Sequence, residues 1–261
     1  MGATPPALRA LEYWIYQYRR MWRGSVISGF ISPLLYLAAM GVGLGSLVNH
    51  HHSSRNSLGG VSYIAFLAPG MLAAIAMQIG AQESTYPVLG GIKWVKNYFA
   101  MLATPLRVVD VLVGQLLWIA MRITLTVTLF LVTMELFGAG HHWTVLLAVP
   151  SAVLTGMAFA VPICAYAATR EGDAAFAALF RFVVMPMFLF SGTFFPVTQL
   201  PKGLRVVAYI TPLWHGVDLC RALALGDAGV VRSLGHVAYL LVFVVAGALW
   251  ARHTFTRRLA T

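Results

Sequence analysis

The stretch FFPVTQLPKGLRVVAYITPLWHGVDLCRALALG, residues 194–226, decides how the chain is organised. It is mostly apolar, yet Pro196, Pro201 and Pro212 divide it into short pieces. Each piece is shorter than the roughly 20 residues that a helix needs to cross a bilayer. The whole stretch is also too apolar for an ordinary loop in water. We therefore expect residues 196–226 to dip into a membrane as half-helices without crossing it.

The composition places the chain among integral membrane proteins. Of its 261 residues, 59% are hydrophobic and only 10% are charged, whereas a soluble domain has roughly 25% charged residues. Lipid must therefore cover part of the surface. Since helices keep their backbone hydrogen bonds within one segment, we expect a single all-α polytopic domain, residues 1–261.

Long apolar runs predict six spans, at residues 24–47, 61–82, 111–136, 143–169, 174–195 and 233–251. An even number of spans places both termini on one side. Most lysines and arginines lie in the termini and in the loops 83–110 and 170–173, and this bias marks the cytoplasmic side. We therefore expect a multi-pass protein of the cytoplasmic membrane with both termini cytoplasmic. Because the net charge of +10 gathers on that side, it indicates the lipid bilayer rather than nucleic acid as partner.

Residues 1–23 form a separate element. Between Pro6 and Arg23, apolar residues recur at spacings of three and four, with basic residues on the other side. This pattern is typical of an amphipathic helix lying in the membrane interface.

The loop 83–110 is the longest on the expected cytoplasmic side. Gly90 and Gly91 are expected to break the chain, so that residues 92–102 form a short helix, and Thr104–Pro105 to start the next helix. A short basic, aromatic helix favours docking of a partner, although an ordinary interfacial loop is an alternative. The candidate docking residues are Lys93, Trp94, Lys96, Asn97, Tyr98, Thr104, Pro105 and Arg107.

The second expected half-helix has clear end signals. Thr211 is suited to cap it, Pro212 to occupy its first position and Gly226 to end it. His215, Asp218 and Arg221 recur every three residues and are expected to share one face. They are candidates for an outer gate, and an Asp218–Arg221 pair with a purely structural role is the alternative.

Two arginines lie within expected spans, where a charge costs about 2.5–3.5 kcal/mol or more. We take Arg122 and Arg181, with the soft side chains Met185 and Phe188, as candidates for a substrate path. The alternatives are that Arg181 reaches the headgroups and that Arg122 bonds to backbone carbonyls. Met185 and Phe188 could instead face lipid or pack in the core of the bundle.

Several kinds of chemistry have no signature in the sequence. It lacks a phosphate-binding loop of the ATPase kind, a metal-binding motif and a nucleophile motif. We expect no catalytic residue, no metal site and no cofactor on this chain. Acidic residues are few, so the sequence also lacks the ionisable groups at membrane depth that an ion-coupled carrier usually needs.

The sequence resembles the ABC-2 type permeases, in particular the daunorubicin-resistance and nodulation-oligosaccharide exporter branch. The resemblance is carried by SGTFFPVTQLP at 191–201, TPLWHGVDLCRALALG at 211–226 and ATPLRVVDVLVGQ at 103–115. It extends over nearly the whole chain through the amphipathic start and the six expected spans.

The resemblance implies the fold of a type V ABC exporter, with re-entrant helices before the last span. It implies a dimer with a second permease, the same chain or a paralogue, and two ATP-binding subunits that carry ATP and Mg. The neighbourhood of residues 92–107 would be the coupling region. The expected cargo is an amphipathic drug or antibiotic moved outward, and a lipid-linked glycan or lipid is the first alternative. A non-transporting assembly or sensor subunit and a secondary carrier are the others.

Overall fold

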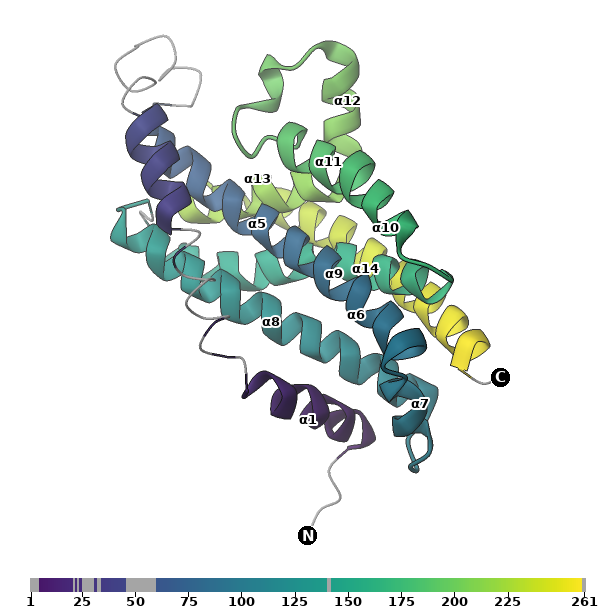
Figure 1. The fold of residues 1–261 in the computed structure, drawn as a ribbon. Coiled ribbons are helices and arrows are strands. Elements are labelled where there is room, and N and C mark those ends of the chain that lie inside the picture. The colour runs from purple at the N-terminus through teal and green to yellow at the C-terminus, as the bar shows by residue number, and fades with distance from the viewer. Residues whose placement is uncertain are drawn as a thin grey trace.

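The computed structural model describes residues 5–20, 22, 24, 31, 34–45, 60–139 and 142–259, and every regular element in these residues is helical (Figure 1). The first expected span, 24–47, lies largely outside the described residues. The elements are α1 (Pro6–Tyr18), η1 (Ala38–Leu44), α5 (Tyr63–Ser84), α6 (Tyr86–Leu89), η2 (Gly90–Trp94), α7 (Asn97–Leu102), α8 (Val108–Leu136), η3 (Trp143–Leu147), α9 (Ala148–Ala168), α10 (Ala174–Leu179), η4 (Phe180–Val184), α11 (Met185–Phe190), η5 (Val197–Gln199), α12 (Lys202–Ile210), α13 (Pro212–Leu225) and α14 (Val230–Leu259).

Four helices in the described part of the chain are long and apolar enough to cross a membrane. They are Tyr63–Trp94, Val108–Leu136, Trp143–Ala168 and Val230–Leu259. The expected span 174–195 is shorter, because the helix ends at Phe190 and Gly192 adopts a left-handed backbone with φ of 85°. The polytopic class is therefore confirmed, while the count of six spans stays a prediction.

α5 is the central helix and packs against α8, α9 and α13. Its closest neighbour is α9, where two glycines let the backbones meet. A Cβ atom on Gly80 would lie 2.5 Å from the Gly156 carbonyl oxygen, and one on Gly156 would lie 2.7 Å from the Ala76 carbonyl oxygen. In lipid no hydrophobic effect drives two helices together, so they associate through close van der Waals packing. Small residues at the crossing permit that packing.

The chain does not break at Gly90 and Gly91 as expected. These glycines continue the helix as η2, and the turn comes at Lys96, whose φ is 56°. A Cβ atom on Gly91 would lie 2.7 Å from the ring of Tyr98. The glycine is therefore required for close approach to the following helix rather than for a break.

The segment after α11 folds into the short 3-10 turn η5 and two helices, with α13 inside the bundle and α12 outside it (Figure 1). The predicted ends of α13 are confirmed: Thr211 Oγ1 accepts a hydrogen bond from the Trp214 amide at 3.4 Å, and Gly226 ends the helix with φ of 76°. α13 packs against α5, α9 and α14, while α12 leaves an apolar face exposed. Entry of this segment into the membrane remains a prediction.

The contact between α5 and α9 can be tested by adding a side chain. Gly156→Val would force the backbones apart, and overpacking of this kind costs about 1–3 kcal/mol. We expect a lower Tm for the purified protein, measured by thermal unfolding in detergent. Gly235→Val is the matched control, because no atom lies within 4 Å of a Cβ atom there. Equal Tm values for the two variants would contradict the proposed crossing.

Candidate functional site

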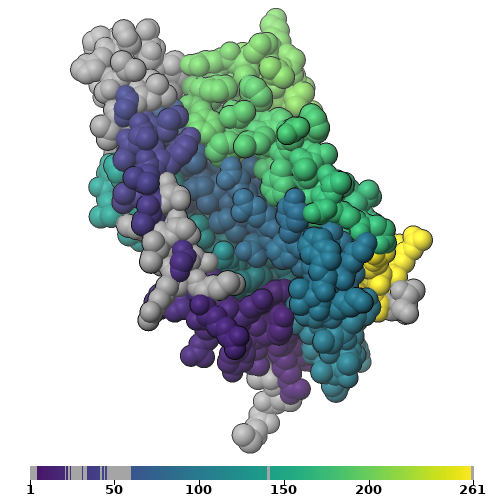
Figure 2. Space-filling model, viewed as in Figure 1, coloured from purple at the N-terminus to yellow at the C-terminus, as the bar shows by residue number. Residues whose placement is uncertain are grey.

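The candidate docking loop presents a small exposed tip. Trp94 is 55% exposed and Val95 is 69% exposed, and Lys93 and Lys96 on either side are exposed as well. Figure 2 shows this stretch beside α1 at one end of the molecule. The tip therefore offers an aromatic ring and the cation of Lys96 to a partner, while Lys93 is paired with Glu171.

The remainder of the loop supports the tip from beneath. Asn97 and Tyr98 are buried, so they are not part of the exposed tip. The Tyr98 hydroxyl donates a hydrogen bond to Gln115 Oε1 on α8 at 3.1 Å, and the Tyr98 ring contacts Trp14 and Phe255. Tyr98 thus joins the loop to α8, α1 and α14.

α8 starts later than the sequence suggests. The Thr104 hydroxyl donates to the Met101 carbonyl at 2.6 Å, which closes α7 rather than capping the next helix. The Asp110 carboxylate instead accepts from the Arg107 amide at 2.9 Å at the start of α8. Thr104, Pro105 and Arg107 remain exposed, so they stay available for docking.

A groove lies between α1 and the loop. α1 contributes three residues to it and the loop contributes the rest. The lining is Pro6, Arg9, Tyr13, Asn97, Ala100, Met101, Thr104, Pro105 and Leu106.

Arg122 is paired with Glu83, a residue that the sequence placed in the loop. α5 extends to Ser84, and Glu83 Oε1 accepts from Arg122 Nε at 3.2 Å while Oε2 accepts from Trp118 Nε1 at 3.2 Å. The side chains of Arg122 and Glu83 are only 21% and 19% exposed. The pair therefore neutralises the charge that Arg122 brings into its span.

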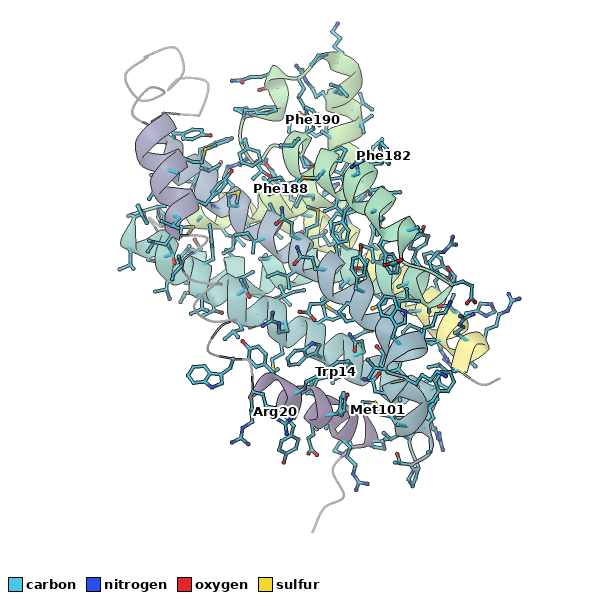
Figure 3. The ribbon with its side chains drawn as sticks, in the orientation of Figure 1. Trp14, Arg20, Met101, Phe182, Phe188 and Phe190 are labelled. Atoms are coloured by element: carbon cyan, nitrogen blue, oxygen red, sulfur yellow. The ribbon has the colours of Figure 1, made fainter. Side chains whose placement is uncertain are left out.

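α1 covers this ion pair. The Arg122 guanidinium lies 4.9 Å from the centre of the Tyr18 ring, and Trp14 stacks on Trp118 with their centres 6.2 Å apart. Figure 3 shows Trp14 between α1 and α8. α1 is therefore fixed to the bundle through aromatic side chains, in addition to any contact with the membrane interface.

Glu171 joins three separate segments at the same end of the molecule. It forms ion pairs with Arg258 of α14 and with Lys93, the latter at 3.5 Å. Hydrogen bonding to Arg258 and the charge of Arg258 lower the pKa of Glu171 to about 2. These ties are fully present above the ordinary carboxyl pKa of about 4 and are lost as the pH falls through the lowered pKa.

The other path candidates lie on a different surface. Arg181 is exposed within the π-turn η4, and Met185 is 55% exposed at the start of α11. Phe188 is half-buried and packs edge-on against Phe194 with ring centres 5.1 Å apart. Figure 3 shows Phe182 of η4 pointing away from the bundle. The structure does not bring this surface together with Arg122.

Asp218 and Arg221 do not form the pair that the spacing suggested. Asp218 lies 2.6 Å from Arg232 and 2.9 Å from His236, both on α14. One step of three residues rotates Arg221 by about 60° around the helix from Asp218, and Arg221 points toward α5. It donates to the carbonyls of Phe66 at 3.1 Å and Gly192 at 2.8 Å.

His215 completes a polar contact between α13 and α14. Its Nδ1 lies 2.8 Å from Nδ1 of His236, and its ring stacks on Tyr239 with centres 3.8 Å apart. The gate candidates therefore make two separate sets of polar contacts. His215 and Asp218 hold α13 to α14, and Arg221 holds α13 to α5 and to the turn after α11.

Comparison of the sequence with known proteins identifies the family. The sequence model of the ABC-2 type transporter family covers residues 11–225. The chain belongs to the ABC-2 type transporter family. It is 32% identical to Nodulation protein J of Rhizobium leguminosarum bv. viciae over 98% of both chains. It is also 32% identical to Nodulation protein J of Rhizobium meliloti (strain 1021) over 94% of both chains.

A more distant relative carries a transport name. The Inner membrane transport permease YadH of Escherichia coli (strain K12) is 23% identical over 89% of this chain and 87% of its own length. Family membership and the apolar helices together identify this ABC-2 transporter as an integral membrane protein. ABC-2 membership also implies association with an ABC ATP-binding subunit.

Sequence reasoning missed three residues of this site in the ABC-2 transporter. Glu83, Gln115 and His236 are polar residues near or within the expected spans, and their partners lie at other places along the chain. One signal was present in the sequence, because an arginine within a span favours an acid at similar depth.

The Glu83–Arg122 pair can be tested by a double-mutant cycle. Glu83→Leu leaves Arg122 without its partner, and breaking a buried pair typically costs about 3 kcal/mol or more. Replacing both residues, as Glu83→Leu with Arg122→Met, removes the stranded charge and should cost less than Glu83→Leu alone. Thermal unfolding in detergent measures both effects. Additive losses of Tm would show that the two side chains do not interact.

Proposed function

We propose that the chain is the permease subunit of an ATP-driven exporter, and that a separate ATP-binding subunit docks on residues 93–107. The observation that carries this proposal is the contrast within the loop: Trp94 and Val95 are exposed at its tip while Tyr98 is buried beneath them. A docking element needs such a free surface on a rigid support. The proposal places ATP and Mg on the ATP-binding subunit and both termini of this chain in the cytoplasm.

The contacts under the loop offer a route for movement into the bundle. Tyr98 contacts Gln115, whose side-chain amide lies 3.5 Å from the Glu83 carbonyl, and the Glu83 carboxylate holds Arg122. A displacement of the tip would therefore move the end of α5. Since α5 packs on α9 and α13, the same movement would reach α13.

We place the cargo path at the surface of α10–η4–α11, between two permease copies. Apolar and soft side chains dominate the exposed part of this surface, including Phe182, Met185 and Leu189. Arg181 is its cation. Soft side chains of this kind adapt to several ligands. On this view, α13 closes the outer end of the path and opens when its ties through Asp218 and Arg221 rearrange.

The cargo we propose is an amphipathic molecule moved outward. An amphipathic drug or antibiotic fits the adaptable apolar surface. A lipid-linked glycan is the second candidate, and it is favoured by the resemblance to nodulation-oligosaccharide exporters; two of the relatives carry the name Nodulation protein J. A non-transporting assembly or sensor subunit would have the same helices but no effect on ATP hydrolysis by a partner.

Variants of the tip test the coupling. We expect Trp94→Ala, or charge reversal at Lys93 and Lys96, to abolish stimulation of the ATP-binding subunit while insertion into the membrane stays normal. Phosphate release by the reconstituted complex measures the stimulation. Val231→Ala is a matched control, because Val231 is 86% exposed on α14 far from the tip. Normal stimulation in all the tip variants would refute the docking assignment.

Photocrosslinking tests the cargo. A photoreactive side chain in place of Phe182 or Met185 should be labelled by the transported molecule in ATP-energised vesicles, and the same group in place of Val132, which is 49% exposed on α8, should not. Labelling by a lipid-linked sugar and never by an amphipathic drug would select the second candidate. Equal labelling at Val132 would contradict a path along α10–η4–α11.

A further inference from the structure

A second groove lies at the end of the molecule that carries the docking tip, between the last turns of α14 and the end of α9. Its volume is about 560 Å³, which is within the usual range for small-molecule sites. The residues from α14 fall at spacings of three and four, so they line one face of the helix. The lining is Ala168, Thr169, Trp250, His253, Thr254, Arg257 and Arg258.

The groove and its rim have an excess of cations. Among the described residues, Arg252, His253 and Arg257 form no ion pair, and all three are exposed. The nearby acid Glu171 is already engaged by Arg258 and Lys93. Asp173 is the other acid of that loop and is exposed.

Other features of the groove reduce the attraction for an anion only in part. α9 and α14 both end here, and helix C-termini carry partial negative charge. At the end of α9, the Thr169 hydroxyl donates to the Tyr166 carbonyl, and Arg170 stacks on the Tyr166 ring and donates to Thr169. The α9 carbonyls are therefore partly satisfied, and the charge of Arg257 remains available.

The position of the groove along α14 indicates a lipid. The exposed surface of α14 is apolar at Val242, Val245 and Leu249, and changes to Trp250 and then to cations. Tryptophan marks the headgroup level of a membrane, and basic residues follow it on the cytoplasmic side. The groove therefore opens where lipid phosphates lie, and from its His253 edge an apolar lane for acyl chains continues along α14 through Leu249 and Val245 at spacings of four.

We propose that this groove binds the phosphodiester of an anionic phospholipid of the inner leaflet, with Arg257 and His253 donating to the phosphate. The acyl chains lie along Val245 and Leu249. Basic pockets between spanning helices on the cytoplasmic side suit such headgroups. An acidic surface of a partner protein would not use the apolar lane, and neither would free phosphate.

Native mass spectrometry of the purified full chain tests the proposal in micelles doped with phosphatidylglycerol and phosphatidylcholine. We expect the chain to retain phosphatidylglycerol in preference to phosphatidylcholine. Arg257→Gln should raise the dissociation constant of phosphatidylglycerol about fivefold, the usual effect of one basic residue at an anionic membrane surface. Arg257→Lys keeps the charge and should retain most of the binding.

Arg20→Gln is the matched control, because Arg20 is exposed at the far end of α1, away from the groove (Figure 3). An equal loss in Arg20→Gln would show diffuse charge attraction and overturn the site. Displacement of the lipid by excess inorganic phosphate would show a free-anion site and overturn it as well. A third overturning result is unchanged lipid retention in Arg257→Gln with weaker association of the ATP-binding subunit, because the groove would then serve a protein.

Discussion

The direct contact of the α5 and α9 backbones is the constraint on which the rest of this bundle depends. Lipid gives no hydrophobic reason for two apolar helices to associate, so they need surfaces that fit closely. Gly80 and Gly156 supply that fit. Once α5 is fixed at the centre, Glu83 at one end of it meets Arg122, and Phe66 near the other end accepts a hydrogen bond from Arg221. The two ends of the bundle that carry the candidate functional residues Arg122 and Arg221 are therefore both held by α5.

The polar residues at the two ends share a physical logic. Several buried or half-buried charges in the described bundle are either paired with an opposite charge, as Arg122 is with Glu83, or bonded to backbone carbonyls, as Arg221 is. Such interactions are costly to break in a medium without water. They can nevertheless exchange partners when helices shift, which suits the proposed change of shape driven by ATP hydrolysis on a separate subunit.

The sequence predicts the class, the long helices and the ends of α13, because these depend on local hydropathy and on capping residues such as Thr211 and Gly226. It does not predict the partners of Arg122, Asp218 and Arg221, because those partners lie on other helices. The glycine pair at 90–91 was misread for the same reason: a glycine that permits close approach has the same sequence signal as one that breaks a helix.

Energised transport is the most direct test of the central claim, that this chain moves cargo only when a separate subunit hydrolyses ATP. The chain and its ATP-binding subunit would be reconstituted in inside-out vesicles with an amphipathic fluorescent reporter. The account predicts accumulation of the reporter that requires hydrolysable ATP and persists when ionophores collapse all ion gradients. Accumulation that continues without ATP and stops with the ionophores would contradict it and identify a secondary carrier.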